Sequence, residues 1–159
     1  MIKVGDRIPS ATLREKTSEG VKPITTDELF KGKKVALFAL PGAFTPTCSA
    51  KHVPSFVSNY DALKAKGVSD IVCVSVNDAF VMEAWGKDQK AEGKIRMLAD
   101  GNGEFSEALG LTFDASGFGM GKRSQRYAMV VDDGVVKTLN VEKPGAFDVS
   151  SGDAVLKAL

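Results

Sequence analysis

The chain is short of the residues that build disulfide frameworks and metal centres, because its 159 residues include only two cysteines and one histidine. A secreted domain that relies on disulfides for its stability would usually carry more cysteines. One histidine and two cysteines that lie far apart in the sequence do not supply a usual set of metal ligands either. The sequence therefore predicts neither a disulfide scaffold nor a metal site.

Long apolar runs and an excess of charge of one sign are also missing. No stretch approaches the length of a membrane span, and Met1–Asp6 lacks the basic and then apolar pattern of a signal segment. The formal net charge of +1 gives no electrostatic case for nucleic acid or an anionic membrane as a partner. The cytoplasm is therefore the expected compartment.

What is present fits one globular domain over residues 1–159. With 43% hydrophobic and 26% charged residues, the chain is long enough to bury a substantial core. Its short lysine clusters, at 31–34 and 64–66, are expected to be solvated faces. No second domain is needed.

The stretch 35–52 combines a buried strand with residues that carry chemistry. Val35–Leu40 is an uninterrupted apolar run that predicts a strand covered on both faces, and Pro41-Gly42 ends it. A proline and two hydroxyl residues at 45–47 then predict the start of a helix. Cys48 should therefore lie in the first turn of a helix that leaves the carboxyl end of a central strand.

A cysteine at a helix start belongs to an identifiable reactive class. The unpaired N–H groups and the dipole of the first turn stabilise a thiolate, which is the nucleophilic form of the side chain. The alternative is that Cys48 is a small buried hydrophobic residue. Its neighbours argue against burial, because they are not core companions: Pro46, Thr47, Ser49, Lys51 and His52. We therefore expect Cys48 to be reactive.

Apolar spacing and turn residues predict the remaining elements. Strands are expected at 8–13, 21–25, 71–76, 96–99, 126–131 and 135–141, the first two joined by a turn at Glu19-Gly20. Helices are expected at 45–64, 79–90, 104–109 and 150–159, with Thr26 capping a further short helical turn and 112–125 forming a loop. A parallel βαβ unit, then an antiparallel hairpin and a terminal helix, is typical of an α/β fold of the thioredoxin type.

The segment around Cys48 also resembles a known active-site pattern. A proline, three residues, a threonine, two residues and a cysteine are similar to the peroxiredoxin signature, and stand here as Pro41-Gly42-Ala43-Phe44-Thr45-Pro46-Thr47-Cys48. With His52 and Pro54 following, the segment resembles the type II, peroxiredoxin-5-like subfamily, which is often glutaredoxin-dependent. The similarity extends from Val4-Gly5-Asp6 through 75–78 to 126–131. It implies a thioredoxin-like α/β fold with an N-terminal β-hairpin extension and a peroxiredoxin-type insertion.

The resemblance implies roles for four residues. Cys48 would be the thiolate that attacks a peroxide, and Thr45 would place its hydroxyl beside the sulfur and a bound peroxide oxygen. Arg126 resembles the arginine that holds the thiolate and the peroxide, while Pro41 would shield the pocket. Without the resemblance, Thr45 could equally be a helix cap, and Arg126 would be interpreted as a surface charge at a strand end.

Three other side chains have open roles. Arg123 is close enough in sequence to be mistaken for Arg126. His52, one helical turn after Cys48, either hydrogen-bonds near the site or is a structural or solvated imidazole. Trp85 could line a pocket, but it belongs to a periodic apolar stripe, which favours a place in the core. The stripe is expected to comprise Phe80, Val81, Ala84 and Trp85.

Attack on a peroxide leaves a sulfenic acid that a second thiol must reduce. Cys73 lies in the middle of a predicted buried strand and is expected to be inert. Some type II relatives place a resolving cysteine near the C-terminus, where this chain has Asp148-Val149-Ser150-Ser151. We therefore predict a one-cysteine peroxidase for hydrogen peroxide and organic hydroperoxides, recycled by glutathione with glutaredoxin or, as second choice, by thioredoxin.

The resemblance also implies an assembly, and no bound cofactor is expected. Type II relatives form homodimers through the active-site end. In this chain Phe44, Phe80 and Phe118 could supply the apolar surface there.

The glycine-rich run Gly117–Gly121 superficially suggests a phosphate loop, but it does not follow a strand and open a helix as a dinucleotide fingerprint would.

Two other functions would use the same cysteine. A thiol-disulfide oxidoreductase normally has a second cysteine separated from the first by two residues, but Thr45 and Lys51 occupy those positions here. A peroxide-sensing redox switch would use the same site chemistry, and the sequence separates it poorly from an enzyme.

Overall fold

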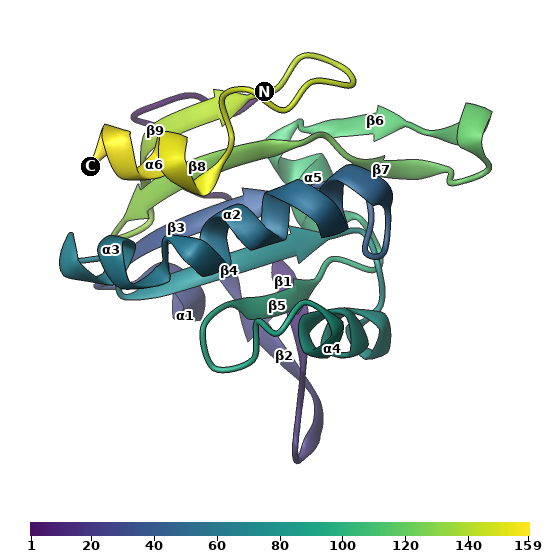
Figure 1. Ribbon diagram of the computed structural model, residues 1–159, viewed down its shortest axis with the longest axis horizontal. Coiled ribbons are helices and arrows are strands. Elements are labelled where there is room, and N and C mark those ends of the chain that lie inside the picture. The colour runs from purple at the N-terminus through teal and green to yellow at the C-terminus, as the bar shows by residue number, and fades with distance from the viewer.

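A seven-stranded mixed sheet forms the centre of the computed structural model, which describes all 159 residues (Figure 1). The strand order is β2-β1-β5-β4-β3-β8-β9. The bounds are β1 (Thr12–Thr17), β2 (Gly20–Thr25), β3 (Lys34–Ala39), β4 (Asp70–Ser75), β5 (Arg96–Ala99), β8 (Tyr127–Asp132) and β9 (Val135–Val141). Inside the sheet β3 runs parallel to β4 and antiparallel to β8. β8 and β9 pair antiparallel. The predicted parallel pair and the predicted C-terminal hairpin are therefore both confirmed.

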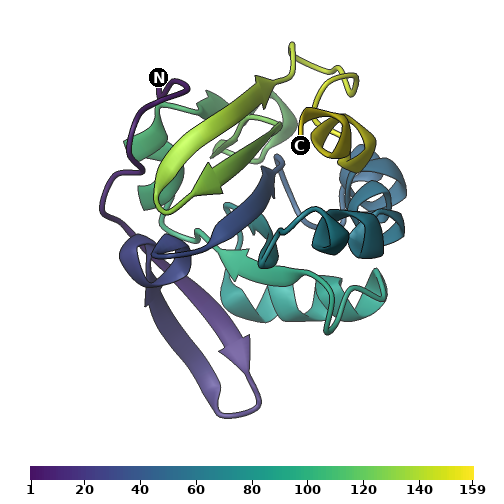
Figure 2. The same cartoon turned by 90° about the vertical axis from the view of Figure 1, so that its left-hand side faces the viewer.

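Helices cover the two faces of this sheet (Figure 2). The α-helices are α1 (Thr26–Phe30), α2 (Val53–Ser58), α3 (Tyr60–Ala65), α4 (Ala79–Asp88), α5 (Glu104–Leu109) and α6 (Gly152–Ala158). A π-helical turn, η1 (Cys48–His52), precedes α2, and a short 3-10 turn, η2 (Ser116–Phe118), lies near β6 and β7. None of these helices is long and apolar enough to cross a membrane.

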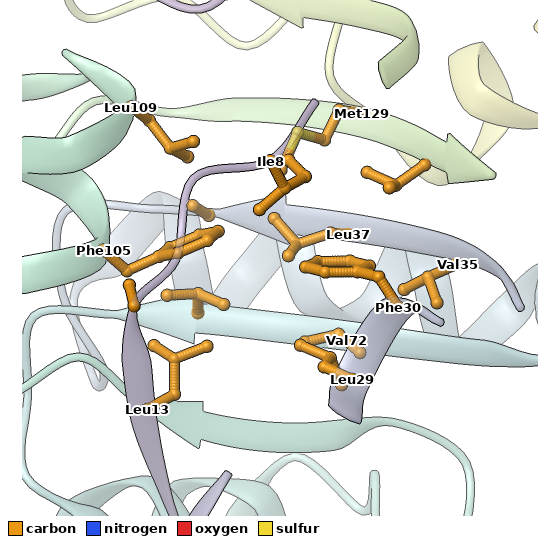
Figure 3. Close-up of a cluster of buried hydrophobic side chains, with 14 of the residues drawn as sticks. Ile8, Leu13, Leu29, Phe30, Val35, Leu37, Val72, Phe105, Leu109 and Met129 are labelled. Carbon is orange, nitrogen blue, oxygen red and sulfur yellow. The ribbon is translucent and has the colours of Figure 1, made fainter. Parts of the chain in front are cut away.

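The sheet has an apolar core on each face, and β3 supplies both. One core packs α1 and α5 against the sheet (Figure 3), and the other packs η1, α2, α3, α4 and α6. Successive side chains of a strand point to opposite faces. Val35, Leu37 and Ala39 accordingly enter the first core, and Ala36, Phe38 and Leu40 enter the second. The continuous apolar run follows from this two-sided burial.

The helix predicted at 45–64 is interrupted twice. Residues 46–47 are α-helical, the chain then widens into η1, and the Val53 N–H bonds to the Cys48 carbonyl. Pro54 has no N–H to donate one turn back, so an α-helical bond is missing where the wide turn ends. At Asn59 the side-chain amide donates to the Ser55 carbonyl (2.7 Å), which separates α2 from α3.

Several predicted boundaries are wrong in the N-terminal part. The first strand begins at Thr12 rather than at residue 8, and the chain before it contains Pro9, which cannot donate to a ladder. The cap of α1 is Thr25 rather than Thr26, because Thr25 and Glu28 form a reciprocal capping box. The predicted hairpin itself is present as β1 and β2, joined through Gly20, whose φ is +113°.

Two predictions fail in the second half of the chain. The buried side of α4 consists of Ala79, Met82, Trp85 and Gly86, and Phe80 is 65% exposed. The predicted stripe therefore shares only Trp85 with the buried one. The expected loop at 112–125 contains a small two-stranded sheet, β6 (Thr112–Asp114) with β7 (Lys122–Ser124). These strands of three residues are too short to show an alternating pattern.

Candidate active site

Cys48 lies at the beginning of η1, one loop beyond the carboxyl end of β3. It is 0% exposed and belongs to the second core, so the expectation that its neighbours keep it out of the core is wrong. Its sulfur nevertheless has a charged partner, because Arg126 Nη2 donates to Cys48 Sγ at 3.1 Å. A guanidinium in contact with sulfur stabilises the thiolate by a charge-assisted hydrogen bond.

The antiparallel register of β3 and β8 brings Arg126 to this position. Ala39 pairs with Tyr127, so Arg126 lies just beyond the pair, beside the end of β3. Tyr127 points into the first core, and alternation sends Arg126 to the opposite face, where Cys48 lies. Arg126 is half-buried and bonded to side chains, so the alternative of a surface strand-end charge is wrong.

His52 holds the other arm of the same guanidinium. Arg126 Nη1 lies 2.8 Å from His52 Nδ1, and His52 Nε2 lies 2.9 Å from the Ser150 carbonyl oxygen. Because a guanidinium only donates, Nδ1 must be the acceptor, and the ring proton is on Nε2, which donates to Ser150. Burial, and then the charge of Arg126, lowers the pKa of His52 to about 3. Of the two roles left open, the structure therefore shows a buried, hydrogen-bonded imidazole.

Aromatic rings enclose this pair of side chains. The His52 ring lies 4.9 Å from Phe38 and 5.0 Å from Phe147, measured between ring centroids. The guanidinium carbon of Arg126 lies 5.9 Å from the centroid of the Phe147 ring, within the range of a cation–π contact. The apolar rings limit water around the guanidinium, which strengthens its interaction with the sulfur.

Thr45 and Pro41 lie in the loop between β3 and η1, and both are half-buried. The Thr45 hydroxyl donates to the Gly42 carbonyl at 2.6 Å and accepts from no backbone N–H, so this side chain does not cap the helix; the Thr45 carbonyl accepts from the Ser49 N–H at 2.9 Å. No hydrogen bond joins it to the sulfur in this structure. With its proton committed to Gly42, Thr45 Oγ1 keeps its lone pairs for an incoming O–H donor.

A side chain just beyond the end of β4 fixes the same loop. Asn77 Oδ1 accepts from the Ala43 N–H (3.0 Å) and from the Ser75 hydroxyl (2.6 Å). Phe44 has a φ of 62°, a left-handed conformation that costs energy for a residue other than glycine. The loop is therefore held in one strained shape by partners outside it. Sequence reasoning missed Asn77, to which it gave no role at the site.

Arg123 has a different task from Arg126. It donates to the Met120 carbonyl at 2.9 Å and to the Val76 carbonyl at 3.1 Å, and it makes no hydrogen bond to Cys48. It therefore braces the glycine-rich loop at 115–121.

Trp85 is buried, as predicted, and its indole N–H donates to the Ser49 hydroxyl at 3.0 Å.

The second cysteine, Cys73, is a free and fully buried thiol in the middle of β4. It is paired with Phe38 in the sheet and lies in the same core as Cys48. Burial, and to a smaller extent negative charge on Cys48, raises the pKa of Cys73 well above that of an ordinary thiol. Cys73 therefore stays protonated and unreactive at neutral pH, as its place in a strand suggests.

The buried histidine makes folding stability depend on pH. His52 is the only histidine, and its pKa is about 3 in the folded chain against an ordinary 6.5. Below about pH 6.5 the unfolded chain takes up a proton that the folded chain refuses until about pH 3, so stability is lost as the pH falls. Between about pH 8 and pH 5 we expect the free energy of unfolding to decrease by about 2 kcal/mol from this group alone.

Urea unfolding of the wild type and of His52→Gln at the two pH values measures this loss. The variant should be less stable at about pH 8 but should lose much less stability on acidification, because it has no imidazole to protonate. A parallel loss in both proteins would show that another group causes it.

Comparisons with known proteins agree with this geometry. A family model described as Redoxin matches residues 3–156. Peroxiredoxin-2E, chloroplastic, of Arabidopsis thaliana is 53% identical over 162 residues, which cover 99% of this chain and 69% of the relative. Peroxiredoxin-2B of the same plant is 48% identical over 159 residues, covering 99% and 98%.

Solved structures give the same family. Reduced Prx3 of Vibrio vulnificus in complex with hydrogen peroxide matches with a TM-score of 0.97 and 57% identity over 99% of both chains. Peroxiredoxin 5 of Alvinella pompejana matches with a TM-score of 0.87 and 42% identity, over 99% of this chain and 97% of the other. The chain therefore belongs to the redoxin family as a type II, peroxiredoxin-5-like peroxiredoxin, a thiol peroxidase with the thioredoxin-like fold that its sequence predicts.

Proposed function

We propose that this peroxidase reduces hydrogen peroxide and organic hydroperoxides through Cys48 alone and is recycled by an external thiol. The 3.1 Å contact between Arg126 Nη2 and Cys48 Sγ supports the assignment of Cys48 as the nucleophile. A relative in complex with hydrogen peroxide, the Vibrio vulnificus protein, supports the choice of peroxide. Cys48 itself is 0% exposed.

In the proposed reaction the Cys48 thiolate attacks one peroxide oxygen and the O–O bond breaks. The departing oxygen takes up a proton and leaves as water or an alcohol, and Cys48 becomes a sulfenic acid. Arg126 compensates the negative charge of the sulfur and of the departing oxygen. Thr45 Oγ1 accepts a hydrogen bond from the peroxide O–H, and Pro41 shapes the pocket without reacting.

An external thiol completes the cycle. One thiol condenses with the sulfenic acid and releases water, and a second thiol frees Cys48 and forms a disulfide. Because Cys73 is buried and protonated, the reducing thiol comes from outside the chain in this proposal. Glutathione with glutaredoxin is the first choice of reductant and thioredoxin the second. We propose the cytoplasm as the compartment, because the cycle consumes reduced thiols.

The homodimer is part of the same proposal. Phe44, Phe80 and Phe118 are 54%, 65% and 81% exposed, which is unusual for large aromatic side chains. Phe44 lies in the loop that leads to η1, Phe118 lies in η2, and Phe80 is the second residue of α4. Association through this apolar surface would cover the side chains.

Steady-state peroxide consumption with each donor system tests the reductant. We expect faster turnover with glutathione and glutaredoxin than with thioredoxin and its reductase. After one equivalent of peroxide without reductant, mass spectrometry should find a sulfenic acid on Cys48. Faster turnover with thioredoxin would reverse the order of donors, and a Cys48–Cys73 disulfide would rule out the one-cysteine cycle.

A further inference from the structure

The carboxylate of Glu142, just beyond β9, gathers one loop around itself. It accepts from the backbone N–H groups of Asp148 (2.9 and 3.0 Å), Val149 (2.8 Å) and Ser150 (2.8 Å). The Ser150 hydroxyl also donates to it at 2.7 Å. Glu142 is 7% exposed, and a buried carboxylate is tolerated only when such donors compensate its charge. This single side chain therefore fixes the conformation of 148–150.

The loop that Glu142 holds reaches the catalytic arginine through His52. The Ser150 carbonyl accepts from His52 Nε2, which leaves Nδ1 as the acceptor for Arg126 Nη1. The second arm of the guanidinium then faces Cys48 Sγ. Glu142, the Ser150 peptide, His52, Arg126 and Cys48 thus form one continuous hydrogen-bonded series from the end of β9 to the sulfur.

We propose that Glu142 is a positioning residue for the peroxidase reaction, which acts by holding the Ser150 carbonyl where it selects the His52 tautomer that orients Arg126. This inference rests on the proposed role of Arg126 at the sulfur. The series transmits position rather than protons, since His52 stays neutral and Arg126 stays charged. The Phe147 ring, which contacts both His52 and Arg126, precedes the same loop and would move with it.

The charge state of Glu142 suits this task. Burial alone would raise its pKa, but the three N–H groups and the Ser150 hydroxyl outweigh burial and lower the pKa of Glu142 overall. The carboxylate is therefore ionised at neutral pH. An amide in its place would bring an NH₂ group against these donors and could accept from only part of them. Glu142→Gln should thus loosen the loop without removing volume.

Asp100 offers a matched control on the other side of the sheet. It is also a buried carboxylate, 2% exposed, and accepts from the N–H groups of Phe105 and Ser106 and from the Ser106 hydroxyl. No hydrogen bond links it to Arg126 or His52. Asp100→Asn should therefore cost stability as Glu142→Gln does, but it should leave the reactivity of Cys48 unchanged.

The experiment compares these variants in the full-length chain by the pH dependence of Cys48 alkylation with iodoacetamide, mapped by mass spectrometry, and by kcat/KM for hydrogen peroxide. For Glu142→Gln we expect the alkylation profile to move to higher pH and kcat/KM to fall by about ten- to a hundredfold. Unchanged values in a folded Glu142→Gln, or an equal shift in Asp100→Asn, would overturn the proposal. The alkylation profile remains informative even if the wild type shows no peroxide turnover.

A double-mutant cycle tests the path of the effect. If Glu142 acts through His52, then Glu142→Gln should cost little further reactivity in a His52→Gln background, whereas independent effects would multiply and contradict the path. Should Glu142→Gln fail to fold, Ser150→Ala removes only the hydroxyl donor. It should shift the alkylation profile in the same direction by a smaller amount, and an unchanged profile in that folded variant would count against the proposal.

Discussion

Replacing Cys48 by serine is expected to abolish peroxide turnover, with a loss on the order of a thousandfold or more, as when other enzymes lose a nucleophile. A serine hydroxyl stays protonated at neutral pH and is a far weaker nucleophile than a thiolate. The loss should appear with every electron donor, because the reaction with peroxide precedes recycling. Stopped-flow mixing with hydrogen peroxide and steady-state turnover both measure it.

Cys73→Ala is the matched control for this loss. Cys73 is buried in β4 in the same core as Cys48, and its raised pKa keeps it protonated. The variant should lose some stability through a small cavity, on the order of 1 kcal/mol. It should keep its reaction with peroxide. Substantial turnover in Cys48→Ser, lost again when Cys73 is also replaced, would show that the wrong sulfur has been chosen.

Local signals in the sequence were sufficient to single out Cys48 as the candidate nucleophile. The apolar run at β3, the break at Pro41-Gly42 and the helix start all lie within a few residues of Cys48, so no tertiary information was needed. The partners of Cys48 could not be found in that way. Arg126 is 78 residues away in sequence, and only the register of β8 on β3 brings it to the sulfur. Resemblance to a family, rather than spacing, identified it.

The burial of side chains inside the site was even harder to predict from the sequence than the position of Arg126. Whether His52 is solvated or buried depends on Phe38, Phe147 and Ser150, which come from three separate segments. The burial of Cys48 was predicted wrongly because polar sequence neighbours describe the adjacent turn, not the core beneath it. The same limit applies to α4, where the predicted apolar face began at Phe80, whereas the buried side begins at Ala79 and leaves Phe80 exposed.

Replacing Arg126 by lysine is expected to reduce kcat/KM for peroxide by about a hundred- to a thousandfold, the usual cost of removing one oriented hydrogen-bond donor at a reacting centre. The positive charge is retained, so the loss depends on geometry. The guanidinium donates to Cys48 Sγ at 3.1 Å with one arm and to His52 Nδ1 at 2.8 Å with the other. A lysine ammonium lacks this planar fork and cannot reproduce both contacts in the same orientation. Cys48 should also alkylate only at higher pH.

Arg123→Lys is the control that separates oriented charge from charge in general. Arg123 is also half-buried, but its partners are the carbonyls of Met120 and Val76. Its replacement should loosen the loop at 115–121 and leave the pH profile of Cys48 alkylation unchanged. If Arg126→Lys retained wild-type kcat/KM, a nearby positive charge would be sufficient, and the held orientation of the guanidinium would have no part in the reaction.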